Sequence, residues 1–398
     1  MKFTKPTILT AFVLAFGAPL SASATTVPDE PKQTEIEVPD ARILSLSPDG
    51  QLLAVRKPIG GQTSELCVYE VASQAERACA DLEGPRISMA DDQVAWSPDS
   101  TQIAFGEDAL RTFLDGDLWV MDASNGELTN LTDDGFEGRL PVLDGDDEQP
   151  DDPVHIDVLP AWAPDSRSIA FSRSSIVDGE WTGNEIAGVD LDGGDVESLT
   201  RVSTDRPGVV YWGLTWAPDG QRLLYSVSDP DNDHPDNGVW EFDEATGETR
   251  HIVPTDPVNG PPALVRVSAT GTTGLVMFPL KLSQQAVHGG IYALLDLESN
   301  ALSALEPPEP DPTAAAFVSV ATFSPDGTQV LFGVTEDASS QLFVRDVPDG
   351  LRAIEAAALD ARPMTTTFGG GLFWGSDGTV FVAIEVGVGV LLDFGADS

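Results

Sequence analysis

Three features of the sequence predict an all-β fold, a seven-bladed β-propeller made of four-stranded antiparallel blades. A turn motif of the type Ser-Pro-Asp-Gly recurs seven times, an apolar triplet follows most copies, and no segment has a long 3.6-residue apolar period. The first turn residue falls at positions 47, 97, 163, 217, 268, 324 and 375, so the steps are 50, 66, 54, 51, 56 and 51 residues. Periods of this size in a strand-rich chain are typical of propeller blades.

Each copy of the motif predicts a tight turn between two antiparallel strands. Proline sets the backbone angle of the second turn position, and Asp followed by Gly or Ser completes a type I turn. We therefore interpret the repeated Asp as a turn former rather than a catalytic acid, and the repeated Trp as blade packing. The copies are LSPDGQLLAV from Leu46, WSPDSTQIAF from Trp96, WAPDSRSIAF from Trp162, WAPDGQRLLY from Trp216, VSATGTTGLVM from Val267, FSPDGTQVLF from Phe323 and WGSDGTVFVA from Trp374.

A second hairpin follows in most repeats and supplies the outer two strands of the blade. Segments 118–128, 186–196 and 239–249 each place an acidic turn between two strand-like runs. The last repeat has room for only two further strands, near 379–385 and 388–394. We expect the alternating segment Thr34–Val38 to complete this last blade, because an incomplete sheet exposes an open edge.

The N-terminus has the pattern of a signal peptide over residues 1–24. Lys2 and Lys5 precede an apolar run, and Ala22-Ser23-Ala24 forms a small-residue cleavage site. Residues 25–40 then hold the closing strand, and residues 41–398 form the propeller. We expect a periplasmic or secreted protein with no transmembrane span after cleavage; an uncleaved N-terminal anchor is the alternative.

The charge of the chain excludes two classes of partner. The sequence holds 65 acidic and 21 basic residues, a formal net charge of −44. A field of this sign repels nucleic acid and anionic membranes, so we predict neither as a partner. The acidic surface favours a soluble protein, which we expect to be a monomer.

Cys67 and Cys79 are the only cysteines and fall on the expected third and fourth strands of the first blade. An exported chain permits a disulfide, and their equal distance from Ser73 in the turn favours a cross-strand bond. Two buried free thiols are the alternative. Their spacing does not resemble a metal or redox motif.

Two long connections, residues 133–160 and 228–238, carry the candidate metal ligands. Both lie on the face of the propeller opposite the Ser-Pro-Asp-Gly turns, where we expect a partner to bind. Asp229, Asp231 and Asp233 alternate in the second connection and offer oxygen ligands for calcium, with an ordinary solvated acidic loop as the alternative. The four histidines map to the same face, where three imidazoles can hold a divalent metal. They are His155, His234, His251 and His288.

The motifs WSPDS, WAPDG and FSPDG, followed by IAF, LLY or LFG, resemble the propeller repeats of the TolB-type periplasmic translocation proteins over residues 41 to 385. This resemblance implies an exported interaction platform without enzymatic activity. The chain departs from that family in its seven copies, where the family has six blades, and in the short segment before the first repeat. The repeats are also similar to those of oligogalacturonate lyases, and this resemblance implies a histidine-bound metal at the propeller mouth, a part that His155, His234 and His288 could play.

These observations favour a non-enzymatic platform that binds an envelope protein or an extracellular ligand, with no cofactor assigned beyond a possible calcium or other divalent metal. The sequence holds no Gly-x-Ser-x-Gly elbow, His-Glu-x-x-His, phosphate loop or dinucleotide fingerprint. The alternative function is a metal-dependent polysaccharide lyase or hydrolase that uses the mouth histidines.

Overall fold

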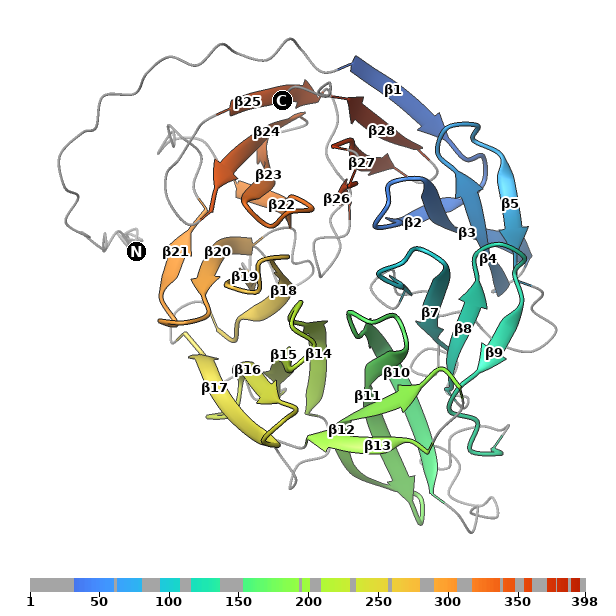
Figure 1. The fold of residues 1–398 in the computed structure, drawn as a ribbon, viewed down its shortest axis with the longest axis vertical. Helices are drawn as coiled ribbons and strands as arrows, with labels where there is room; N and C mark the ends of the chain where they lie inside the picture. Colours follow the sequence, from blue (N-terminus) through green and yellow to red (C-terminus); the bar gives the residue numbers. More distant parts are fainter. Residues whose placement is uncertain are drawn as a thin grey trace, which may run out of the picture.

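The computed structural model is a ring of seven four-stranded antiparallel sheets arranged around a central axis (Figure 1). It describes residues 32–60, 63–80, 94–107, 116–136, 153–192, 195–200, 209–229, 234–256, 260–279, 290–305, 317–336, 339–347, 354–359, 371–376, 378–385 and 388–393. The predicted signal peptide, residues 1–24, lies outside this part. None of the described segments forms a helix that could cross a bilayer.

In blades 1 to 6 the strands follow one another in chain order from the axis outward. Blade 1 holds β2 (Arg42–Leu46), β3 (Leu52–Gly60), β4 (Thr63–Glu70) and β5 (Glu76–Cys79). Blade 2 holds β6 (Val94–Trp96), β7 (Gln102–Gly106), β8 (Leu118–Asp122) and β9 (Leu128–Asn130). Blade 3 holds β10 (Val154–Trp162), β11 (Ser168–Val177), β12 (Glu180–Asp190) and β13 (Glu197–Thr200). Blade 4 holds β14 (Val210–Trp216), β15 (Arg222–Ser228), β16 (Gly238–Asp243) and β17 (Glu248–Pro254).

The remaining blades complete the ring. Blade 5 holds β18 (Ala263–Val267), β19 (Thr273–Pro279), β20 (Gly290–Asp296) and β21 (Leu302–Ala304). Blade 6 holds β22 (Phe317–Phe323), β23 (Gln329–Glu336), β24 (Ser339–Asp346) and β25 (Ile354–Leu359). Blade 7 holds β26 (Leu372–Trp374), β27 (Val380–Glu385), β28 (Val388–Asp393) and, as its outermost strand, β1 (Lys32–Glu37).

The N-terminal strand closes the last blade, which confirms the prediction for this segment. β1 pairs antiparallel with β28 from Lys32 opposite Asp393 to Glu37 opposite Val388. Figure 1 shows the blue β1 beside the dark red β28, so the two ends of the described chain meet in one sheet. The observed strand begins two residues earlier than expected, at Lys32 rather than Thr34.

The hydrophobic core is divided into clusters that lie between neighbouring blades. Inner-strand side chains of each blade pack against the next blade, and one such cluster occurs at each of the seven junctions. At the junction of blades 7 and 1, Ile36 of β1 packs with Phe381 of β27 and Val55 of β3, and all three are buried. The closing strand therefore contributes to the core as well as to the sheet.

In the described turns that hold an Asp, its carboxylate bonds within the turn; the blade 5 copy has Thr270 at this position instead. In the first copy, Ser47 donates its hydroxyl to Asp49 at 2.5 Å, and the backbone N–H of Gln51 donates to the same carboxylate at 3.0 Å. The bond from Ser324 lowers the pKa of Asp326 in the equivalent position of blade 6. The carboxylates of these copies act as local acceptors, as the motif predicts.

These turns also contact one another around the axis. The backbone N–H of Asp49 donates to Ser100 of the next turn at 3.1 Å, and that of Asp99 donates to Ser166 at 3.2 Å. Ser376 of blade 7 donates its backbone N–H to the carbonyl of Pro48 at 3.3 Å, across the closure. We call the side of the ring that carries the seven turns the turn face, and the opposite side the loop face.

Cys67 and Cys79 face each other across β4 and β5 and form a disulfide, with the sulfurs 2.00 Å apart and a sequence separation of 12. Replacing both with alanine should lower the free energy of unfolding by about 3 kcal/mol, because the bond restricts the unfolded chain. Chemical denaturation with and without a reductant measures this. Reduced wild type should match the double variant, and a reductant should not change the variant; equal stability of oxidised wild type and variant would contradict the prediction.

Candidate functional site

A cavity of about 830 Å³ lies on the axis of the ring and is lined by all seven blades. The first strand of each blade, β2, β6, β10, β14, β18, β22 and β26, contributes its C-terminal end, and several of the following turns form the rim. The cavity therefore lies toward the turn face. Its volume is in the range of sites that bind small ligands or peptide segments. We call it the central cavity.

A β-bulge recurs in the first strand of five blades and shapes the wall of the central cavity. The register between the first two strands shifts after Ile43, Val158, Trp212, Leu264 and Val318. A bulge inserts unpaired residues and turns the strand. Leu44, Leu159, Gly213 and Val265, which follow four of these shifts, all line the cavity.

Gly213 shows why one of these bulges needs a glycine. Its φ angle is +61°, and a Cβ there would lie 2.2 Å from the carbonyl oxygen of Leu264 in blade 5. Both the left-handed backbone and the close approach of blade 5 exclude a larger side chain. The wall at this point is thus closed by backbone rather than by side chains.

Aromatic side chains surround the cavity as well as filling the gaps between blades. Trp96 and Trp162 are buried in the clusters between blades 1 and 2 and between blades 2 and 3, yet both contribute to the cavity wall. Trp216 and Trp374 are more accessible, and Phe323 completes the set. The packing role expected for the repeated Trp is therefore accompanied by a second role, because the end of each first strand borders both a neighbouring blade and the axis.

One basic residue, Arg266 of β18, lies among the residues that line the cavity. Its Nη1 donates to Thr322 Oγ1 at 3.4 Å. Both residues occupy the position just before the aromatic or aliphatic residue that opens the repeat motif. The equivalent positions elsewhere hold Ser45, Ala95, Ala161, Thr215 and Phe373. Arg266 is not among the site residues predicted from the sequence, although it is the one basic residue among the seven copies at this position.

A second polar cluster lies between blades 2 and 3 on the loop face. Arg173 of β11 donates Nε and Nη2 to the two carboxylate oxygens of Asp157 at 2.8 and 2.6 Å, and both side chains are buried. Burial raises the pKa of Asp157, and the pairing with Arg173 opposes that rise. Nearby, Asn130 Nδ2 donates to Asp117 Oδ2 at 2.7 Å. Burial, with the charges of Glu107 and Asp134, raises the pKa of Asp117 to about 7.

Replacing Asp117 with asparagine should raise the free energy of unfolding at pH 8 by about 1–2 kcal/mol. A raised pKa in the folded state means that the folded protein binds a proton more tightly than the unfolded chain. The wild type therefore loses stability as the pH rises from about 4 to 7, and the loss is complete above pH 7. Asparagine stays neutral and still accepts from Asn130. Urea denaturation between pH 3 and 8 measures the difference, which should vanish at pH 3; parallel curves for the two proteins would contradict this account.

The described histidines lie in separate local environments. His155 of β10 has its Nδ1 3.0 Å from Ser175 Oγ, and burial, followed by the charge of Arg173, lowers its pKa. His234 Nδ1 lies 3.6 Å from a carboxylate oxygen of Asp236. His251 stacks on Trp240 with ring centroids 4.3 Å apart, and burial lowers its pKa. His288 lies outside the described residues, so the three-histidine metal site stays a prediction.

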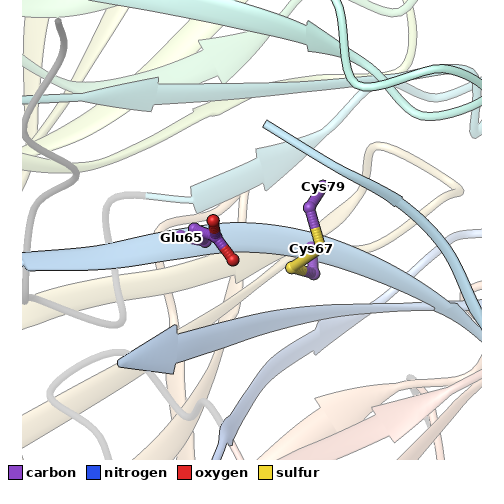
Figure 2. Close-up of side chains that lie close together, drawn as sticks. All are labelled: Glu65, Cys67 and Cys79. Carbon is purple, nitrogen blue, oxygen red and sulfur yellow. A yellow bond between two sulfur atoms is a disulfide. The ribbon is translucent and has the colours of Figure 1, made fainter. Parts of the chain in front are cut away.

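The predicted calcium loop is described only at its ends. Asp229 is buried, and its backbone N–H donates to Asn237 Oδ1 at 2.6 Å. Asp231 and Asp233 lie outside the described residues. In the described part of the chain, one group of three or more metal-ligating residue types gathers within ligand distance, and it consists of Glu65, Cys67 and Cys79 (Figure 2). The two sulfurs of that group are bonded to each other, so they do not offer thiolates.

Comparisons with known proteins show the fold of the chain. No protein-family model and no curated protein matches it. It is similar to the crystal structure of oligogalacturonate lyase from Vibrio parahaemolyticus, with 11% identity, 92% of this chain and 98% of that chain covered, and a TM-score of 0.55. It is similar to the β-propeller domain of Cps50 (Swd1) from Myceliophteria thermophila, with 11% identity, 90% and 98% covered, and a TM-score of 0.55.

The crystal structure of TolB from Acinetobacter baumannii is also similar, with 15% identity, 85% of this chain and 78% of that chain covered, and a TM-score of 0.41. The likeness to the lyase and to the Cps50 domain, both with a TM-score of 0.55, establishes a propeller and leaves the activity open, because unrelated functions share this fold. The function must therefore be argued from the site.

Proposed function

We propose that the protein is exported and works, without catalysis of its own, as a binding platform at the cell envelope, in the periplasm or outside the cell. The observation that carries this proposal is the central cavity, about 830 Å³ in volume and lined by all seven blades. A rigid ring with an aromatic-lined cavity on its axis suits binding. The N-terminal pattern of residues 1–24 and the disulfide favour export to an oxidising compartment. The partner is an envelope protein or an extracellular ligand.

Export is tested by expressing the full chain and a variant without residues 1–24 and separating the periplasm from the cytoplasm. The full chain should be released by osmotic shock with a mature N-terminus at Thr25, and the truncated chain should stay in the cytoplasm. Retention of residues 1–24 on a membrane-bound product would overturn the soluble platform in favour of an anchored one.

Binding in the central cavity is tested by filling it. Ser45 lines the cavity, and the equivalent position of blade 7 holds Phe373, so we expect the blade to tolerate Ser45→Phe and the larger side chain to reduce the volume of the cavity. Ser73→Phe, in an exposed outer turn of the same blade, is the matched control. Wild type and Ser73→Phe should capture the same envelope component after crosslinking, and Ser45→Phe should lose it. Equal capture by Ser45→Phe would remove the cavity from the proposal.

The metal-dependent lyase is the competing function, and elemental analysis separates the two. Purified protein should hold no stoichiometric manganese or zinc after dialysis against buffer without chelator. One bound metal ion per chain, lost on replacing His155 or His234 with alanine, would overturn the non-enzymatic platform.

A further inference from the structure

Arg266 is an isolated positive charge on the axis of a strongly acidic protein. The central cavity is lined by one basic residue, whereas the chain as a whole carries a net charge of −44. Its closest polar contact is the long hydrogen bond to Thr322, at 3.4 Å. Within the described ranges, no carboxylate lies at salt-bridge distance from its guanidinium.

Other arginines of the same propeller are paired with acids. Arg173 makes two bonds to Asp157, and Arg250 Nη2 lies 3.0 Å from Glu241 Oε1. Arg222 Nη2 lies 2.9 Å from Asp219 Oδ2. Arg266 has no such partner among the described residues, although the chain holds 65 acidic residues. Its guanidinium instead borders the central cavity, which is large enough for a small ligand.

The walls of the central cavity exclude part of the water that would hydrate the guanidinium of Arg266 on an open surface. Its side chain is exposed to the water of the cavity, but the walls displace the bulk solvent around it, and this desolvation lowers the pKa of its guanidinium. An arginine remains charged even so. A guanidinium in such a place is stabilised most by an anion that accepts hydrogen bonds from two of its nitrogens at once.

The walls determine which anion fits. Trp216, Phe323 and Trp374 give the cavity aromatic surfaces, so the uncharged part of a ligand can be apolar or aromatic. Asp49 and Asp99 stand at the rim and repel ions of high negative charge. These two conditions favour a single carboxylate over phosphate or a polyanion.

We propose that Arg266 anchors a ligand in the central cavity by binding one carboxylate whose carrier is apolar or aromatic. The free carboxyl end of a peptide and a small aromatic acid share this chemistry. The inference rests on the proposed function, because both place binding in the cavity, and it adds the chemical class of the ligand.

The experiment measures binding of defined probes to the purified full chain by calorimetry and by tryptophan fluorescence, to which Trp216 and Trp374 respond. One probe is N-acetyl-alanyl-alanyl-phenylalanine with a free carboxyl end, tested against its C-terminal amide. The other is 3-phenylpropionate, tested against 3-phenylpropionamide, with citrate as the polyanion. The variants are Arg266→Gln, Arg266→Lys, Ser45→Phe and Ser73→Phe. Thermal unfolding of each variant verifies that the fold is retained.

At least one free acid should bind wild type and Ser73→Phe more tightly than its amide and than citrate. Arg266→Gln should weaken that binding by roughly 10- to 100-fold and remove the preference for acid over amide. Arg266→Lys should retain part of the affinity, since it keeps the charge and loses the fork. Binding by the peptide acid alone assigns a chain terminus, and binding by 3-phenylpropionate alone assigns a small organic acid.

The failures of the two proposals are distinguishable. One outcome is that acid and amide bind equally well, that Ser45→Phe blocks this binding, and that Arg266→Gln does not change it. This result would overturn the carboxylate anchor and leave binding in the cavity intact. If no free acid binds wild type better than its amide, the carboxylate site is wrong. Capture of an envelope component that Ser45→Phe abolishes would support the platform independently of these probes.

Discussion

Replacing Ile36 with alanine should lower the free energy of unfolding by about 3–4 kcal/mol, a large share of the stability of one domain. Ile36 lies in the middle of β1 with its side chain buried against blades 7 and 1. Truncation creates a cavity at the one junction of the ring where two distant parts of the chain are joined. Chemical denaturation followed by tryptophan fluorescence measures the loss.

Glu35→Ala is the matched control for this prediction. Glu35 lies in the same strand with its side chain exposed, so its replacement should change the free energy of unfolding by less than about 0.5 kcal/mol. Equal effects of the two substitutions would show that β1 does not contribute its buried face to the core. Deleting residues 32–38 should have a stronger effect, with aggregation, because β28 then becomes an open edge.

Replacing Arg173 with methionine should cost about 3–5 kcal/mol at pH 8, because it leaves the buried carboxylate of Asp157 without its partner. The loss should shrink as the pH falls. Without Arg173, the pKa of Asp157 in the folded state rises further above its unfolded value, so protonation at low pH relieves the buried charge. Denaturation at pH 8 and pH 5 measures both effects.

The double variant Arg173→Met/Asp157→Asn tests whether the unpaired carboxylate of Asp157 causes the loss of stability. Removing the second charge should restore most of the stability lost at pH 8, so that the difference in free energy of unfolding from wild type becomes similar at the two pH values. A double variant as unstable as Arg173→Met alone would assign the effect to other lost contacts of the arginine, whose guanidinium carbon lies 5.5 Å from the centre of the Phe171 ring.

The sequence carried enough information to predict the blades because their signals are local. A Ser-Pro-Asp-Gly turn needs only neighbouring residues, and its repetition gave the number of blades and their limits to within a few positions. The closing strand was predictable for a different reason. The last repeat lacked room for a fourth strand, and Thr34–Val38 had no other partner.

The site was less accessible to prediction because its parts come together across blades. The position of Arg266 in the cavity depends on tertiary structure, because the bulge after Leu264 and the neighbouring blade place it beside Thr322 on the axis. The pair Asp157 and Arg173 joins two strands, and the backbone N–H of Asp157 donates to the carbonyl of Gly116, just before the third strand of blade 2. The long acidic connections and the histidines predicted a site on the loop face. The described cavity lies toward the turn face instead, where the repeated motif predicts turns and gives no sign of a cavity.

The pairing of β1 with β28 also has a consequence for folding during synthesis. Lys32 leaves the ribosome early, but its partner Asp393 is made only after all the intervening blades. Each blade can fold as it emerges from the ribosome. The ring stays open, however, until the last hairpin has been made and β1 can pair with it. Until β28 has been made, the unpaired β1 can pair with a strand of another molecule. A chaperone that covers this strand would therefore protect the protein from aggregation while the ring is still open.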